Sequence, residues 1–79
     1  MNSLEELLAW IARGLVDEPD AVRVERVEEA DAVVLRLSVA PDDVGKVIGR
    51  QGRVARALRT LVRSAGARGD KRLLLEIQS

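Results

Sequence analysis

The sequence contains no cysteine and no histidine among its 79 residues. Without cysteine, the chain forms no disulfide and offers no thiolate to a metal ion. Without histidine, it lacks the usual general base of enzymes and the commonest metal ligand. We therefore expect neither an enzyme nor a bound cofactor.

Aromatic side chains are almost absent as well, because Trp10 is the only one and there is no Phe or Tyr. Binding of single strands by base stacking needs aromatic platforms. Any nucleic-acid binding by this chain must instead use backbone amides, arginine–phosphate contacts and aliphatic packing. Trp10 lies off the apolar stripe of its expected helix, so it is interpreted as an exposed flank, an interface residue or a lid over the core edge.

Long apolar runs are missing too. No stretch of eighteen apolar residues is present, so no membrane-spanning helix is expected. The N-terminal segment is acidic and amphipathic, unlike a basic and apolar signal sequence. A chain of this length buries only about 60% of its unfolded surface, which favours one domain over residues 1–79 with a thin core. These features predict a soluble cytoplasmic protein.

The formal net charge of zero conceals an asymmetry along the chain. Residues 1–43 hold four Lys or Arg and eleven Asp or Glu, a net charge of −7, whereas residues 44–79 hold nine and two, a net charge of +7. A basic half of this kind favours a nucleic-acid face. The alternative is that the acidic half neutralises the basic half within the fold.

Apolar spacing predicts an α+β fold with the order helix, strand, strand, helix, helix, strand. The first helix begins at a capping box formed by Ser3 and Glu6 and ends near Val16, ahead of Pro19. Its core-facing stripe follows helical spacing and comprises Leu4, Leu7, Leu8, Ile11 and Leu15.

Alternating apolar residues over 21–28 and 32–39 predict an antiparallel hairpin with a turn at 29–31. The alternation slips near Glu25 and Arg26, which predicts a β-bulge. A basic turn over 68–72 precedes a last strand at 73–78. The apolar content of that strand predicts that it pairs inside the sheet.

The most specific pattern is Gly49-Arg50-Gln51-Gly52, between a short and a longer helix. The short helix starts at Pro41-Asp42-Asp43, with a carboxylate at its N-terminus, and must end at Gly49. Glycines tolerate positive φ and let backbone approach a ligand, and the N-terminus of the following helix is electropositive. The turn therefore predicts a phosphate site. The alternative is a helix cap at Gly49 followed by a second turn residue.

The longer helix separates apolar and basic residues on opposite arcs and ends at Gly66 and Gly69. The apolar arc holds Val54, Leu58, Leu61, Val62 and Ala65, and the basic arc holds Arg53, Arg56, Arg59 and Arg63. A merely solvated face usually carries acidic partners three or four residues away, and here there are none. This favours an RNA-binding stripe over a solvated face, although part of the stripe is expected to face solvent only.

Val47-Ile48-Gly49-Arg50-Gln51-Gly52-Arg53, placed between two helices, resembles the signature of the KH domain, a single-stranded nucleic-acid-binding module. The order of elements resembles the type II arrangement of bacterial KH proteins. A chain of this length is similar to the small bacterial KH-only proteins of the KhpA (YlqC) type. The resemblance covers essentially all 79 residues.

The resemblance implies RNA binding in a shallow groove, where a GXXG loop clamps the sugar–phosphate backbone of about four nucleotides. It also implies a three-stranded sheet with helices packed on one face. By position, the resemblance assigns the clamp to Gly49, Arg50, Gln51 and Gly52 and its flanking cations to Lys46 and Arg53. It assigns the apolar groove floor to Val47 and Ile48. Arg56 joins the expected RNA-binding residues as a member of the basic arc.

The resemblance further implies an RNA chaperone or post-transcriptional regulator that pairs with a larger KH-containing protein of the KhpB (Jag/EloR) type and serves cell shape and peptidoglycan homeostasis. The alternative is a dimerising interaction scaffold with weak or no RNA binding, and a homodimer would gain avidity from two grooves. A nucleotide-binding P-loop is excluded because Gly45-Lys46 is followed by Val47, and no glycine stands five residues earlier.

Overall fold

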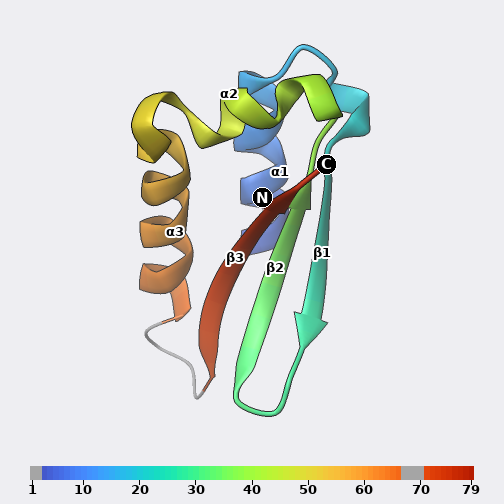
Figure 1. Cartoon of the computed structure of the whole chain (residues 1–79). Coiled ribbons are helices and arrows are strands. Elements are labelled where there is room, and N and C mark those ends of the chain that lie inside the picture. Colours follow the sequence, from blue (N-terminus) through green and yellow to red (C-terminus); the bar gives the residue numbers. More distant parts are fainter. Residues whose placement is uncertain (1–2, 67–70) are drawn as a thin grey trace.

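The expected order of helices and strands is confirmed by the structure, a computed structural model that describes residues 3–66 and 71–79. Three short 3-10 turns, η1 (Pro19–Ala21), η2 (Pro41–Asp43) and η3 (Arg50–Gly52), link the main elements (Figure 1). These elements are α1 (Leu4–Leu15), β1 (Arg23–Glu28), β2 (Ala32–Ser38), α2 (Val44–Ile48), α3 (Arg53–Gly66) and β3 (Arg72–Gln78).

The three strands form one mixed sheet in the order β1-β2-β3, with β2 in the centre. The β1–β2 hairpin is antiparallel, as expected, and the Glu29 N–H closes its turn on the Ala32 carbonyl at 2.8 Å. β3 pairs in parallel with β2, because α2 and α3 return the chain to the start of that strand. β3 therefore pairs with β2 alone and occupies a sheet edge, whereas its apolar content had predicted a place inside the sheet.

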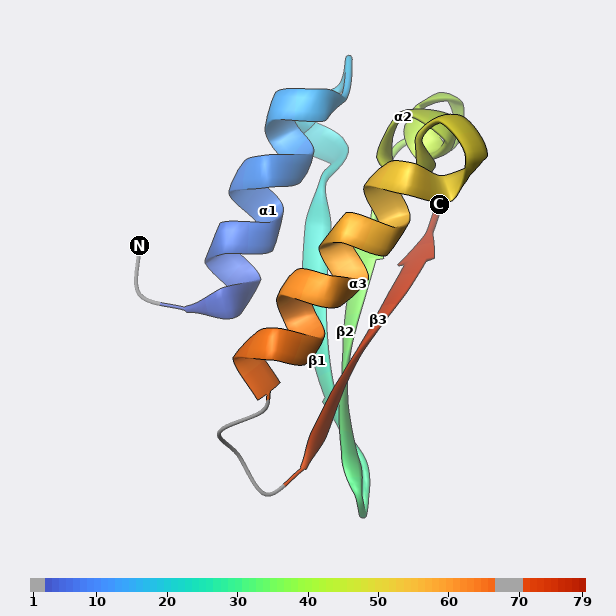
Figure 2. The same ribbon diagram turned by 90° about the vertical axis from the view of Figure 1, so that its left-hand side faces the viewer.

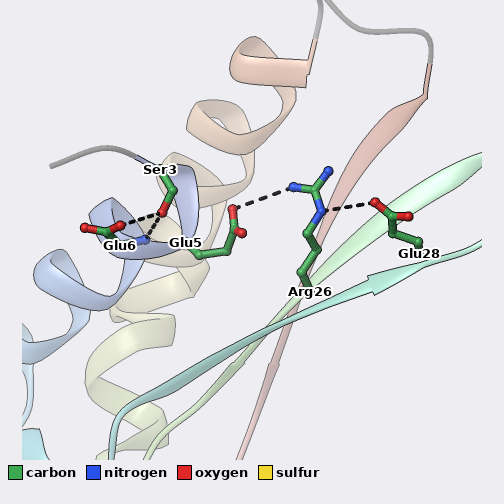
Figure 3. Close-up of polar contacts among 5 residues, drawn as sticks. All are labelled: Ser3, Glu5, Glu6, Arg26 and Glu28. Atoms are coloured by element: carbon green, nitrogen blue, oxygen red, sulfur yellow. Dashed lines mark hydrogen bonds and ion pairs between the residues drawn. The ribbon is translucent and has the colours of Figure 1, made fainter.

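The β-bulge expected near Glu25 and Arg26 is not formed. β1 pairs with β2 residue for residue, from Arg23 opposite Ser38 to Glu28 opposite Val33. The slip in hydrophobicity has another cause, which Figure 3 shows. The Arg26 guanidinium lies 3.7 Å from the Glu5 carboxylate of α1 and 3.4 Å from Glu28. A charged residue thus occupies the margin of the helix-covered face through ion pairs, and the strand stays regular.

α1 and α3 lie side by side on the same face of the sheet, which leaves the other face open (Figure 2). The alternation along β2 divides its residues between the two faces. Val33, Leu35 and Leu37 are buried under the helices, whereas Arg36 on the opposite face pairs with Glu25 and Glu76 of its neighbours. The other buried apolar residues of this core are Leu8, Ala9, Ala12, Val22, Val39, Val47, Leu58 and Val62.

The start of α1 confirms Ser3 as its N-cap. The Glu6 N–H donates to Ser3 Oγ at 3.1 Å, and the Ser3 hydroxyl donates to the Glu6 carboxylate at 3.3 Å (Figure 3). The end of the helix differs from expectation, because Leu15 is 38% exposed. Val16, one residue beyond the helix, packs against the core instead. Trp10 is 62% exposed and is not among the core-packing residues, so it closes no core edge.

The helix after the GXXG loop follows most of the expected pattern, with Leu58 and Val62 buried and its arginines exposed, but Ala65 of the apolar arc is exposed. Gly66 is its last residue, while Gly69 and most of the expected basic turn lie outside the described residues. Arg72 belongs to β3. No helix in the ranges 3–66 and 71–79 combines the length and hydropathy needed to cross a bilayer.

Candidate nucleic-acid interface

The candidate site is the connection between α2 and α3, at the end of the molecule opposite the β1–β2 turn (Figure 1). α2 ends as expected at Gly49, whose N–H donates to the Gly45 carbonyl at 2.9 Å. Gly49 has φ 78° and ψ 171°, and a Cβ there would lie 2.5 Å from Val54 Cγ2. Both the backbone angles and the close approach of α3 therefore require glycine at this position.

Two further residues of the loop have positive φ. Gln51 has φ 57° and ψ 24°, and Gly52 has φ 74°. The Gly52 N–H donates to the Gly49 carbonyl at 3.1 Å. In the described part of the chain, no loop or cap hydrogen bond uses the N–H groups of Arg50 and Gln51. Successive free N–H groups in such a turn form an anion-binding concavity.

Arg56 holds this turn from one helical turn into α3. Its Nη2 donates to the Gln51 backbone carbonyl at 2.8 Å, while Arg53 Nη2 lies 3.4 Å from the Gln51 side-chain oxygen. The Arg56 guanidinium covers the Gln51 carbonyl, whose partial negative charge would otherwise repel a phosphate. The sequence pattern indicated Arg56 only as an RNA contact, and its bond to the loop backbone was missed.

Lys46 was expected to flank the loop, but its side chain pairs with two carboxylates of the fold. Its Nζ lies 3.1 Å from an Asp17 carboxylate oxygen and 3.2 Å from Asp43 Oδ1. The hydrogen bond to Asp17, followed by that to Asp43, raises the pKa of Lys46 above its usual value. Two carboxylates of the fold thus engage this ammonium group, which leaves it less available to a phosphate.

The short helix was expected to begin at Pro41-Asp42-Asp43 with a carboxylate at its N-terminus. Asp43 is the N-cap residue of α2, but its side chain makes no capping bond. Its carboxylate is 1% exposed and accepts the N–H groups of Asp17 at 3.2 Å and Glu18 at 3.0 Å. Burial alone would raise the pKa of Asp43, but these two bonds and the one from Lys46 outweigh burial and lower it. Asp43 therefore fastens α2, which carries the loop, to the segment that follows α1.

The two apolar residues expected in the groove floor have different positions. Val47 is fully buried in the core, so it cannot line a surface under the bases, and that part of the expectation was wrong. A helix of five residues has one position that points straight into the core, and Val47 occupies it. Ile48 keeps an accessible side chain next to Gly49.

Four α3 arginines and Arg50 of the loop remain as unneutralised charge. Among residues 3–66 and 71–79, the second-half cations that form ion pairs are Lys46, with Asp17 and Asp43, and Arg72, with Asp31. Neutralisation within the fold therefore does not extend to the exposed guanidiniums of Arg50, Arg53, Arg56, Arg59 and Arg63. The same described residues bring together no group of acidic side chains able to hold a metal ion.

KH domains clamp a nucleic-acid backbone with a GXXG loop, and here Gly49–Gly52 forms such a loop between two helices, with free amides and arginines beside it. The family model described as "KhpA/KhpB, KH domain" matches residues 5–77. The chain belongs to the KhpA/KhpB KH-domain family. The expected α+β, type II KH-like fold is thereby confirmed.

Similar proteins are named "RNA-binding protein KhpA" in several bacteria. The chain is 50% identical to the protein of Caldanaerobacter subterraneus over 91% of its own length and 96% of the relative's. It is 50% identical to the protein of Bacillus subtilis over 94% of its own length and 91% of the relative's. It is 47% identical to the protein of Aquifex aeolicus over 98% of each chain. These names describe RNA-binding proteins and not enzymes, in agreement with the non-catalytic interpretation.

Proposed function

We propose that this chain binds single-stranded RNA, with Gly49–Gly52 clamping the sugar–phosphate backbone. The observation that carries the proposal is the left-handed loop whose Arg50 and Gln51 N–H groups are free beside unneutralised arginines. The names of the relatives support RNA as the ligand. Arg50 and Arg53 contribute charge to the phosphates, and Arg56 contributes both charge and loop geometry.

The bases contribute little to recognition in this proposal. Ile48 offers aliphatic contact, and the chain has no Phe or Tyr on which bases would stack. We therefore expect modest affinity and weak sequence preference. Each phosphate contact on a single strand adds about −0.7 to the slope of log K against log salt, so four contacts give about −3.

The wider role is a proposal of the same kind. Residues 1–79 act as one KH unit of a cytoplasmic RNA chaperone or post-transcriptional regulator, which serves cell shape and peptidoglycan homeostasis with a KhpB-like partner. The joint KhpA/KhpB family description supports the choice of partner. The second candidate is a dimerising scaffold with little RNA binding of its own, and the exposed Trp10 favours it.

Fluorescence anisotropy of a labelled short single-stranded RNA tests the loop. The double variant Arg50→Asp/Gln51→Asp should lose salt-sensitive binding, because it places two carboxylates at the free amides. The matched control is Arg72→Asp/Ala30→Asp, which makes the same change in net charge at exposed positions near the β1–β2 turn. Thermal unfolding establishes that both variants fold.

The outcomes separate the two candidate functions. If the loop variant loses binding and the control keeps it, the clamp is supported. Equal binding by all three proteins, at a low and at a high salt concentration, would move the site away from the loop. A wild type that binds with a salt slope near zero would count against phosphate clamping. If the wild type does not bind RNA at all, the scaffold is the better description.

A further inference from the structure

The two sides of the GXXG loop differ in charge. On the side of α3, the exposed side chains include four arginines and no carboxylate: Arg53, Arg56, Arg59 and Arg63. On the side of α2, Lys46 contacts the carboxylates of Asp17 and Asp43. Their chain neighbours Glu18 and Asp42 are acidic and exposed as well. A phosphate backbone is therefore attracted to one side of the loop and repelled from the other.

The Asp17 carboxylate reaches Lys46 from the segment that follows α1. Figure 1 shows that the chain leaves α1 at the end of the molecule where α2 lies. Asp17 Oδ2 lies 3.1 Å from Lys46 Nζ, and the Asp17 backbone N–H donates to Asp43 Oδ1 at 3.2 Å. Because the backbone bond does not depend on the Asp17 side chain, it holds residue 17 beside Lys46 whichever side chain stands there.

The two carboxylates beside Lys46 differ in how firmly they are held. Asp43 is buried and accepts two backbone N–H groups in addition to the Lys46 ammonium. The Asp17 side chain is 78% exposed, and within residues 3–66 and 71–79 its one ion pair is with Lys46. An ion pair with so exposed a partner is weak and is screened by salt. The Asp17 carboxylate can therefore be removed while the fold stays intact.

Lys46 stands where a strand would pass if it continued from the loop across α2. It precedes Gly49, the C-cap of α2, by three residues, so the two lie on the same side of the helix. Its side chain is exposed and has a flexible four-carbon stem. An ammonium group has three N–H donors, of which the two carboxylates engage two. Lys46 therefore keeps a donor for a phosphate, but one ammonium group with two carboxylates has a net charge of −1.

We propose that Asp17 withholds Lys46 from RNA, so that the phosphate contacts made at the loop do not extend onto α2. With both carboxylates present, the group repels a phosphate. Without the Asp17 carboxylate, the charges of Lys46 and Asp43 balance, and the ammonium group can bridge Asp43 and a phosphate. Asp17 thereby limits the length of strand that the protein contacts. This inference rests on the proposed RNA clamp, which supplies the strand, but the clamp does not depend on it.

The salt dependence of RNA binding tests the role of Asp17. Fluorescence anisotropy would use a labelled single-stranded RNA about twice the four-nucleotide length that a KH clamp holds, so that the strand extends beyond the loop. Asp17→Asn should bind about threefold more tightly, the scale of one exposed ion pair. It should also make the slope of log K against log salt more negative by about 0.7, the value of one phosphate contact.

The matched control is Asp20→Asn. It removes the same charge at an exposed position three residues further along the chain. The Asp20 carboxylate forms no ion pair within residues 3–66 and 71–79. This variant should therefore keep the salt slope of the wild type.

Two measurements on Lys46 identify the group that gains the contact. Lys46→Gln should leave the salt slope of the wild type unchanged, and it should cancel the gain when it is added to Asp17→Asn. In NMR spectra of the lysine ammonium groups, the Lys46 signal should shift on addition of RNA in Asp17→Asn and stay unchanged in the wild type. Lys71 is the only other lysine in the chain, so the two signals are readily assigned. Thermal unfolding establishes that each variant folds.

Three results would overturn the inference. The first is a salt slope for Asp17→Asn that is no steeper than the slope for Asp20→Asn. The second is a gain in slope that persists when Lys46→Gln is added. The third is a wild-type Lys46 signal that shifts on addition of RNA, because the lysine would then contact RNA despite Asp17.

A failure of the clamp is recognised separately. In that case Arg50→Asp/Gln51→Asp would bind RNA as the wild type does, whatever the slope of Asp17→Asn. If neither the wild type nor Asp17→Asn bound RNA, the clamp and the role of Asp17 would both be wrong.

Discussion

α1 and α3 cover the same face of one sheet and are built alike, yet their exposed sides differ in chemistry. The exposed side of α3 carries arginines and no acidic residue, and its first turn organises a loop with free amides. The exposed side of α1 carries Trp10, one arginine and the carboxylates of Glu5 and Glu6. The comparison shows that core patterning fixes where a helix lies, whereas the residues left over decide what it can bind.

Exchanging a glycine in each region for alanine should give the largest contrast. Gly49→Ala should lower the free energy of unfolding by about 3 kcal/mol or more, because it forces a side chain into φ 78° and against Val54. Gly14→Ala on α1 should raise it by about 0.5–1 kcal/mol, because helix propensity increases in open space. Urea unfolding measures both, and similar values for the two variants would contradict the close approach at Gly49.

Asp43→Asn weakens the contact between the start of α2 and the segment that follows α1. It should lower Tm, since the amide keeps only one oxygen for the Asp17 and Glu18 N–H groups. The folded-state pKa of Asp43 is depressed below 3.8, so its contribution is present above that pH and disappears as pH falls through the folded value. The Tm difference between wild type and variant should therefore shrink below about pH 4. A pH-independent difference would mean that the charge is irrelevant.

Arg56→Lys makes a smaller change that tests how α3 acts on the loop. Lysine keeps the charge but cannot reproduce the fixed guanidinium bond to the Gln51 carbonyl. RNA affinity should fall several-fold with an unchanged salt slope, and the amide NMR signals of Gln51 and Gly52 should shift in the free protein. Arg59→Lys is the matched control, since Arg59 is an exposed cation on the same helix, two turns from the loop. If both variants changed RNA affinity equally, Arg56 would contribute only charge and not loop geometry.

Local patterns predicted most of the fold, because the spacing of apolar residues and the residue types of turns depend on residues close together in the sequence. The hairpin, the end of α2 at Gly49 and the two arcs of α3 followed from such patterns. The errors arose where distant elements meet. Arg26 sits in a regular strand because Glu5 of α1 pairs with it, a contact that no spacing within the strand reveals.

The candidate site was predictable to the same degree. The two glycines located the loop, and the structure adds that Gln51 is left-handed as well. The spacing of apolar residues could not show that Val47 is buried, because a five-residue helix gives too few positions to define a face. The roles of Lys46 and Asp43 depend on the segment after α1, which lies about 25 residues away in the chain. Only the spacing of Asp43 and Lys46 at i, i+3 gave a local hint.

The parallel pairing of β3 with β2 also determines the order in which this protein can fold. Arg36 and Glu76 meet across this pair although 40 residues separate them, and α2, the loop and α3 lie within that span. The β1–β2 hairpin can form early because its contacts are local, whereas closing a span of this length is slow. The layer of helices over the sheet is therefore completed only when β3 docks. During synthesis, α2, the loop and α3 would emerge before the strand that closes the sheet beside them.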